Sequence, residues 1–376
     1  MRVLQIGTFY PPTRRGGVEN YLQQLCAGLK DFVDVQVLVS NRTRKTTCEM
    51  VDGVKVCRVG MWAFVARAPI SPAMALAIRR IPADIIHFHH PNPVAMLAYL
   101  MSGHTGKLII SYHSDIVRQK VLKKMTEPIL SLAFQRCKAF IASSSNYVES
   151  SAVLRKYRHR CRVIPFGISS DFAPIDQRAV DEIRRLHGPR VVLSVGRLVY
   201  YKGFEFLIRA MSTVRAKLLI VGVGPLRPKL EEEVHRLGVR ERVSLLGQVE
   251  QLAPYYHAAD VFVLPSVARS EAFGIVQLEA MACGKPIVNT SLDSGVPAVS
   301  LDGVTGLTVA PRDSRALADA INTLLEQDEL RARFGEAGRL RVKSEFNLES
   351  MIHRTLDLYK DVFVDAQRGR DQISAP

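Results

Sequence analysis

Short apolar runs alternate with longer amphipathic stretches along the 376 residues, and this alternation restricts the fold more than any other feature. Some of these runs contain too few polar residues for a strand with one face in solvent, for example VLQIG (3–7), KLIISYH (107–113) and AKLLIVGVG (216–224). Strands buried on both faces and separated by helical stretches are typical of parallel sheets covered by helices. We therefore predict an α/β fold made of doubly wound sheets.

The alternation runs through two rounds, and a chain of this length exceeds the usual size of a single core. The stretch PFGISSDFAPID between the rounds contains two prolines and has no periodicity, so we place the domain boundary there. We predict two Rossmann-like domains facing each other across a cleft, with ligands at the carboxyl ends of the strands. The expected strands are 3–7, 33–39, 55–60, 84–88, 107–113, 139–144 and 161–167, then 191–198, 216–224, 242–249, 260–266 and 285–290.

The net charge of +15 is confined to the first half of the chain. Residues 1–165 contain 24 Lys and Arg against 9 Asp and Glu, whereas residues 166–376 contain 27 of each. Basic clusters occur at 79–80, 118–124 and 155–162. A one-sided basic surplus favours an anionic partner, and we expect an anionic membrane surface. A solvated basic face is the alternative. Nucleic acid is not expected, because the clusters lack interleaved aromatic residues.

The six cysteines show neither a C-x-x-C pair nor metal-ligand spacing, so we expect them to be reduced, buried and structural. A disulfide between Cys48 and Cys57 is the alternative. The chain starts directly on a strand pattern and has no run of 18 apolar residues, so neither a signal peptide nor a transmembrane helix is expected. These features predict a cytoplasmic location.

The stretch SEAFGIVQLEAMACGKPIV (270–288) carries Glu271 and Glu279, which are eight positions apart. On a helix this spacing places both carboxylates roughly along one face. Gly274 leaves backbone N–H groups bare near the expected helix start, where unpaired donors and a partial positive charge favour a phosphate. Two carboxylates beside a phosphate site predict a nucleotide-sugar pocket. For an isolated pair, a helix cap and a solvated side chain would be the alternative.

This stretch closely resembles the E-x7-E signature of the retaining family-4 glycosyltransferases, which have the GT-B fold. The resemblance extends over nearly the whole chain. It implies an acceptor-binding domain at residues 1–168 and a nucleotide-sugar-binding domain at residues 169–346. It also implies that a C-terminal helix, about 347–376, packs back on the first domain.

The resemblance implies a role for each polar motif. Glu271 would bind hydroxyls of the transferred sugar and Glu279 those of the ribose. Cationic Arg197 and Lys202, in GRLVYYKG, would neutralise the diphosphate. The other donor-binding residues would be glycines and residues that offer backbone amides: Gly16, Gly17, Gly222, Gly224, Val249, Phe273, Gly274, Ile275 and Val276. From the residues alone, the pair Gly16 and Gly17 and the pair Gly222 and Gly224 fit ordinary turns equally well.

His113 ends the expected strand at 107–113, so its side chain should face the cleft. The resemblance implies that His113 contacts the transferred sugar and helps to orient the reacting centre, with assistance from Asp115. A satisfied core histidine is the alternative. His87, His89 and His90 have no carboxylate or cysteine nearby to complete a metal site. We expect neither a metal nor any other cofactor, because Arg197, Lys202 and a helix dipole would take the place of a cation.

The resulting hypothesis is a retaining hexosyltransferase that uses a nucleotide diphosphate sugar, either GDP-mannose or a UDP-hexose. The acceptor would be a membrane-associated, lipid-linked saccharide in polysaccharide or glycolipid synthesis. We expect front-face attack, because we identify no nucleophile opposite the leaving group. His113, Glu271, Arg197 and Lys202 would form the catalytic set. The alternatives are a soluble transferase that makes a small glycoside and a sugar-nucleotide-binding protein without turnover.

Overall fold

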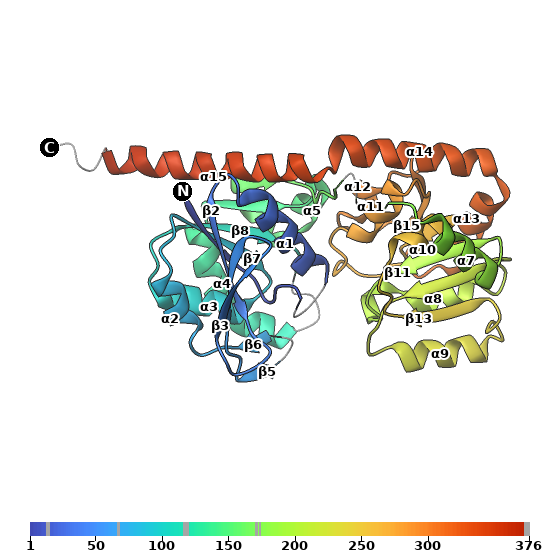
Figure 1. Ribbon diagram of the computed structural model, residues 1–376, viewed down its shortest axis with the longest axis horizontal. Helices are drawn as coiled ribbons and strands as arrows, with labels where there is room; N and C mark the ends of the chain where they lie inside the picture. Colours follow the sequence, from blue (N-terminus) through green and yellow to red (C-terminus); the bar gives the residue numbers. More distant parts are fainter. Residues whose placement is uncertain (13–15, 66–67, 116–119, 170–171, 173, 372–376) are drawn as a thin grey trace. The chain divides into compact units, whose positions relative to one another are not determined.

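The computed structural model describes residues 1–12, 16–65, 68–115, 120–169, 172 and 174–371, with side chains left out for 120–125 and 365–371 (Figure 1). The chain divides into two compact units, each considered by itself below. The first comprises Met1–Phe166 together with Glu349–Pro376, and the second comprises Gly167–Leu348. The sequence predicted domain boundaries after residues 168 and 346, and the unit boundaries lie two residues away, after residues 166 and 348.

The first unit is built on an eight-stranded sheet with the order β10-β9-β8-β7-β1-β2-β4-β3. All neighbours are parallel except β3 and β4. The strands are β1 Arg2–Ile6, β2 Asp34–Ser40, β3 Thr47–Val51, β4 Val54–Val59, β7 Ile85–His90, β8 Lys107–Tyr112, β9 Ala139–Ala142 and β10 Cys161–Val163. A separate hairpin consists of β5 Ala63–Val65 and β6 Ala68–Ile70.

Helices connect the strands of this unit, as the alternating pattern requires. They are α1 Gly17–Leu29, α2 Met74–Arg80, α3 Pro93–Ser102, α4 Lys120–Arg136, α5 Ser145–Ser150, α6 Ala152–Lys156 and the 3-10 turn η1 Arg158–Arg160. Every residue of β7 is buried, because helices cover both faces of the sheet there. The last helix, α15 Leu348–Asp371, packs on this unit through Tyr359, whose hydroxyl accepts a hydrogen bond from Gln5 of β1 at 2.9 Å.

The second unit has a six-stranded parallel sheet with the order β13-β12-β11-β14-β15-β16. Its strands are β11 Val191–Val195, β12 Lys217–Val221, β13 Val243–Gly247, β14 Val261–Val263, β15 Ile287–Thr290 and β16 Gly306–Val309. The helices are α7 Gln177–His187, η2 Tyr200–Lys202, α8 Phe204–Ala210, α9 Arg227–Arg236, α10 Ala253–Ala258, α11 Ile275–Ala282, α12 Val296–Val299, α13 Ser314–Glu326 and α14 Asp328–Glu345. Both sheets confirm the predicted α/β class.

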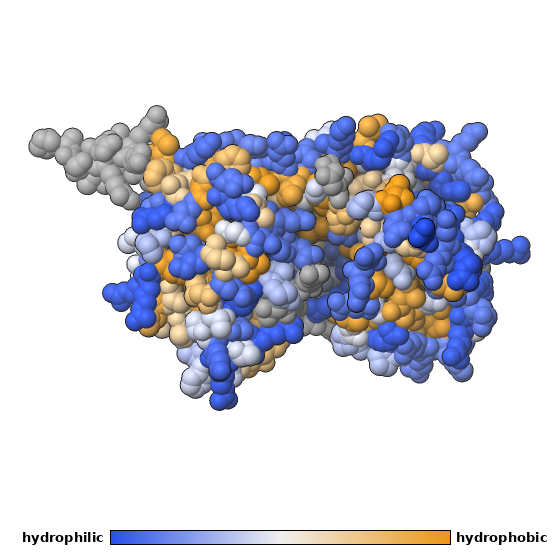
Figure 2. Space-filling model, in the orientation of Figure 1, coloured by the Kyte–Doolittle hydropathy of each residue, from blue (hydrophilic) through white to orange (hydrophobic). Residues whose placement is uncertain are grey.

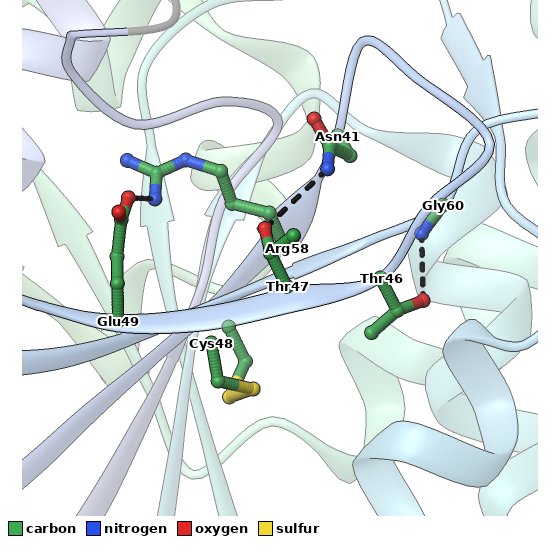
Figure 3. Close-up of a disulfide and its surroundings, with 8 residues drawn as sticks. Asn41, Thr46, Thr47, Cys48, Glu49, Arg58 and Gly60 are labelled. Atoms are coloured by element: carbon green, nitrogen blue, oxygen red, sulfur yellow. Dashed lines mark hydrogen bonds and ion pairs between the residues drawn. A yellow bond between two sulfur atoms is a disulfide. The ribbon is translucent and has the colours of Figure 1, made fainter.

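The edge strand β3 places Cys48 opposite Cys57 of β4, and the two residues form a disulfide with their Cα atoms 4.1 Å apart (Figure 3). The expectation that the cysteines are all reduced and buried is therefore wrong for this pair. The structure supports the alternative weighed from the sequence, although β3 itself is exposed and was not among the expected strands. The other four cysteines are free thiols: Cys26, Cys137, Cys161 and Cys283.

The disulfide generates a prediction about thiol count and stability. The unfolded, unreduced protein should titrate four thiols, and reductant should raise the count to six. Closing a loop with a sequence separation of nine residues restricts the unfolded chain, so Cys48→Ala/Cys57→Ala should lose about 2–3 kcal/mol of unfolding free energy. Denaturant unfolding followed by far-ultraviolet circular dichroism measures this loss.

Reductant provides the control for that measurement. It should destabilise the wild-type protein and leave the double variant unchanged. Six thiols in the unreduced protein would contradict the pairing.

Candidate functional site

Polar groups of the second unit gather where its parallel strands end. Lys202 closes the short turn η2 after β11, and Glu271 lies in the loop between β14 and α11. Lys202 Nζ is 2.6 Å from Glu271 Oε2, and both side chains are about nine-tenths buried. Ser266 Oγ donates a second hydrogen bond to the same oxygen at 3.1 Å. Two loops far apart in sequence are thus joined by one buried ion pair.

The charge on Lys202 is sustained by its acidic surroundings. Burial alone lowers the pKa of Lys202, but Glu271, Tyr201 and Glu279 together raise it above its ordinary value. The ammonium is therefore charged at neutral pH. Removing one member of such a buried pair leaves the other uncompensated, at a cost of about 3–5 kcal/mol.

Glu279 lies on the second turn of α11 and is half-buried. Burial raises the pKa of Glu279, and the hydrogen bond from Tyr256 with the charge of Lys202 offsets only part of that increase. Tyr256 OH donates to Glu279 Oε2 at 2.6 Å. The prediction that both glutamates lie along one face of a helix is wrong, because α11 begins only at Ile275 and Glu271 precedes it. Lys202 nevertheless interacts electrostatically with both carboxylates.

The start of α11 supplies unpaired backbone donors beside this ion pair. Gly274 caps the helix with φ of +77°, a conformation that favours glycine, and a Cβ there would lie 2.6 Å from Leu264. Ile275 and Val276 form the first turn, where N–H groups have no helical acceptor. Phe273 is buried, and its carbonyl accepts a hydrogen bond from Gln277 Nε2 at 3.1 Å. These residues therefore combine amide donors with a nearby cation.

Gly222 and Gly224 have a structural explanation within the unit. A Cβ on Gly222 would lie 2.0 Å from the carbonyl oxygen of Gly196, and a Cβ on Gly224 would lie 2.4 Å from that of Leu198. The loops after β11 and β12 therefore pack backbone to backbone, and only glycine fits. Their donor-binding role stays a prediction.

The other residues predicted to bind the nucleotide sugar lie in several separate loops or at a helix start. Arg197 is exposed in the loop after β11, and Val249 is half-buried just beyond β13. In the first unit, Gly16 caps α1 and Gly17 begins it, but neighbouring residues 13–15 lie outside the described part of the chain. The basic cluster at 118–124 likewise lies outside the described side chains.

His113 follows β8 in the first unit and belongs to a buried hydrogen-bonded chain. His113 Nε2 is 3.0 Å from His89 Nδ1, and His89 Nε2 is 2.9 Å from Gln5 Oε1. Tyr359 OH of α15 is 2.5 Å from His87 Nδ1, and His87 Nε2 is 2.7 Å from Ser111 Oγ. The imidazoles of His89 and His113 are stacked, 5.3 Å apart.

The partners in this hydrogen-bonded chain determine which imidazole nitrogens carry a proton. Burial lowers the pKa of His87 and His113 to about 3 and that of His89 well below 6.5, so all three are neutral at pH 7. Gln5 donates its amide N–H to Tyr359, so its carbonyl oxygen accepts from His89 Nε2–H. His89 Nδ1 then accepts from His113 Nε2–H. His113 is left with Nδ1 as a hydrogen-bond acceptor.

The predicted helper Asp115 has a structural role. Asp115 Oδ1 accepts hydrogen bonds from Tyr112 at 2.8 Å and from Ser151 at 2.9 Å, and its backbone N–H donates to Tyr147. These bonds fix the chain leaving β8 to the helices that follow β9. In the described part of the chain, no three His, Cys, Asp or Glu side chains are arranged to hold a metal ion.

Sequence reasoning missed several residues that support these groups. Gln5 is the one polar residue in the apolar run VLQIG, a signal that pointed to a buried hydrogen bond but not to its partner. Tyr359 and Tyr256 carried no signal, because aromatic residues on helices usually only fill the core. Ser266 lies in a loop whose path depends on the fold.

The buried histidines of the first unit, which include His90 beside the hydrogen-bonded chain, generate a prediction about acid stability. His87, His90 and His113 have folded pKa values of about 3 against about 6.5 when unfolded, so the unfolded state binds more protons below pH 6.5. Stability is complete above pH 6.5 and falls as the pH drops towards 3. At pH 5.5 the loss is about 1.4 kcal/mol for each histidine. Denaturant unfolding at pH 7.5 and 5.5 measures it.

Two variants isolate this effect. His90→Phe should reduce the pH-dependent loss by one histidine's share, because His90 stacks on Tyr112 and its Nδ1 has no hydrogen-bond partner. Tyr99→Phe, at another buried aromatic position of the same unit, should keep the full loss. Equal losses in both variants would disprove the assignment.

Comparisons with known proteins identify the family of the chain. The model described as "Glycosyltransferase Family 4" matches residues 15–172, and "Glycosyl transferases group 1" matches residues 176–341. O-antigen chain mannosyltransferase C of Escherichia coli is 31% identical over 96% of this chain and 98% of its own. D-rhamnosyltransferase WbpZ of Pseudomonas aeruginosa is 32% identical over 92% of each chain.

A solved structure supports the fold. Sucrose-phosphate synthase from Thermosynechococcus elongatus superposes with a TM-score of 0.83 at 24% identity, covering 97% of this chain and 99% of that one. Together with the two family models and the two curated relatives, this likeness establishes the family and the fold. The chain is a transferase that belongs to the family-4 glycosyltransferases and has the GT-B fold.

Proposed function

We propose that this protein is a retaining glycosyltransferase that moves a hexose from a nucleotide diphosphate sugar to a lipid-linked saccharide. The observation that carries the proposal is the charged Lys202 paired with Glu271, next to the bare N-terminus of α11 and to Glu279. A cation, amide donors and two carboxylates match the phosphates and hydroxyls of such a donor.

Each group has a role that follows from its chemistry. Lys202, Arg197 and the amides of Ile275 and Val276 bind the diphosphate, with Phe273 and Gly274 shaping the approach. The carboxylate of Glu271 accepts hydrogen bonds from sugar hydroxyls, and that of Glu279 accepts them from the ribose. The remaining donor contacts come from the backbone at Gly16, Gly17, Gly222, Gly224 and Val249.

The proposed reaction needs no covalent intermediate. The acceptor hydroxyl attacks the anomeric carbon on the face that the phosphate leaves, and its proton passes to the departing phosphate oxygen. Lys202 and Arg197 stabilise the developing negative charge, so the acceleration comes from positioning and preorganised charge. His113 Nδ1, held as an acceptor by His89, orients a hydroxyl of the sugar. Neither a metal nor another cofactor enters this proposal.

We favour GDP-mannose as the donor, with a UDP-hexose as the other candidate. The similarity to an O-antigen mannosyltransferase supports a mannosyl donor and an acceptor in polysaccharide or glycolipid synthesis. The basic surplus of residues 1–165 supports a peripheral position on the cytoplasmic face of a membrane, because that leaflet is anionic. None of the helices in the described residues is long and apolar enough to cross a bilayer.

The donor assignment predicts the outcome of a thermal-shift titration. A ligand that binds only the folded state raises the melting temperature, and at one ligand concentration the tighter ligand gives the larger shift. GDP and GDP-mannose should raise it more than UDP, ADP or dTDP and their sugars. A larger shift with UDP would move the donor to a UDP-hexose, and no shift with any nucleotide would contradict the proposed site.

The phosphate site predicts separate effects on binding and stability. Lys202→Met should weaken nucleotide diphosphate binding and cost transfer about 2–4 kcal/mol of transition-state stabilisation. It should also lower the melting temperature, because Glu271 is left buried and unpaired. Isothermal titration with GDP and UDP and thermal melts measure the two effects.

A second variant separates folding from function. Lys202→Met/Glu271→Gln removes both charges and should recover much of the stability without recovering binding. Lys217→Met, at a half-buried lysine that bonds a backbone carbonyl of the same unit, is the control that should bind normally. Normal binding by Lys202→Met would place the phosphates elsewhere.

A further inference from the structure

The hairpin formed by β5 and β6 is an exposed apolar element outside the main sheet. Scattered hydrophobic areas on the surface are ordinary (Figure 2). Here, however, Trp62, Phe64 and Val65 lie within four consecutive residues and are 65%, 50% and 56% exposed, and Ile70 of the partner strand is also exposed. A two-stranded hairpin is marginal in water unless its apolar side chains are covered. Covering these side chains would therefore stabilise the element.

The hairpin lies at the carboxyl edge of the first sheet, the edge from which His113 emerges. Phe64 contacts Phe9, which follows β1, with ring centres 6.3 Å apart. Ser71, which follows β6, donates a hydrogen bond to Ser40 at the end of β2. Parallel strands bring their carboxyl ends to one edge, so β8 ends there too. Figure 1 shows β5 and β6 at one end of this unit.

A basic loop is fastened to the base of the hairpin. Thr46 Oγ1 accepts a hydrogen bond from the Gly60 N–H at 3.0 Å (Figure 3), and Met61 N–H donates to the carbonyl of Thr43 at 2.8 Å. This loop carries exposed Arg42, Arg44 and Lys45. The Arg44 guanidinium lies 5.7 Å from the centre of the Trp62 ring. The nearby Glu49 carboxylate is paired with Arg58, so the loop's own charge is positive.

We propose that the β5–β6 hairpin inserts into the interface of an anionic lipid bilayer. Trp62, Phe64, Val65 and Ile70 enter the headgroup region, and the loop at 42–45 binds lipid phosphates. Tryptophan favours the membrane interface, and basic residues beside an apolar surface add electrostatic attraction. A protein partner would match the apolar side chains but would not explain three uncompensated cations around them.

This inference extends the proposed function, because a lipid-linked acceptor is the reason to dock at this edge. With the hairpin in the interface, the part of the carboxyl edge beside β1 and β2 lies next to the bilayer. The headgroup of a lipid-linked saccharide then reaches the side of the sheet where His113 lies without leaving the membrane. The hairpin is thus the part of the basic first unit that contacts the membrane.

The single tryptophan makes the proposal testable without labels. Vesicles of phosphatidylglycerol and phosphatidylethanolamine at low salt should shift the Trp62 emission to the blue, and brominated phosphatidylcholine mixed into them should quench it. Phosphatidylcholine vesicles should give neither effect. Phe64→Ser/Val65→Ser should weaken vesicle binding by about tenfold or more, because two apolar side chains no longer enter the interface.

A matched variant serves as the control. Leu186→Ser/Leu340→Ser removes two similarly exposed apolar side chains from the second unit and should bind vesicles as the wild type does. Equal weakening in both variants, or vesicle binding with unchanged Trp62 emission, would overturn the proposal. So would a blue shift that depends on protein concentration without vesicles, because it would indicate contact between copies of the chain.

The thermal shift with nucleotides distinguishes this proposal from the proposed function. Both serine variants should keep the wild-type response to GDP or UDP. A normal nucleotide response without membrane insertion rejects only the hairpin. Membrane insertion without any nucleotide response rejects only the donor site.

Discussion

Parallel strand pairing determines where this molecule can hold polar groups. Inside each sheet the strands are buried on both faces, so charged side chains have room only where the strands end. In the second unit that edge collects Lys202 and Glu271 from loops almost 70 residues apart in sequence. These two loops pack closely because Gly203 meets the backbone of Pro265, where a Cβ would lie 2.1 Å from the carbonyl oxygen. The ion pair is therefore a product of the topology rather than of local sequence.

The core of the first unit buries a chain of polar side chains in their neutral forms. Gln5, His87 and His89 lie on buried strands, and each ring nitrogen of the two histidines has a partner. Because the imidazoles are neutral, every bond needs one donor and one acceptor, and the amide of Gln5 selects the direction for the whole chain. A local substitution at one member therefore alters the proton positions of the others.

The sequence was sufficient for features that depend on periodicity. The apolar runs located seven of the eight strands of the first sheet and five of the six strands of the second. It failed where tertiary pairing decides: β3 is exposed, β5 and β6 are three residues each, and β16 is a short edge strand. At the candidate site, residue identity pointed to Lys202 and Glu271. Their mutual contact, and the partners Tyr256 and Gln5, depend on loops and sheet order that no spacing rule encodes.

The origin of Tyr359 has a consequence for synthesis of the protein on the ribosome. The sheet of the first unit is complete once residue 163 has emerged, but the hydroxyl that bonds Gln5 and His87 is translated almost 200 residues later. Until α15 arrives, the buried amide and imidazole lack their shared partner. The core of the nascent first unit therefore contains polar groups without their final hydrogen-bond partner. The last helix completes this core only after the whole second unit has been made.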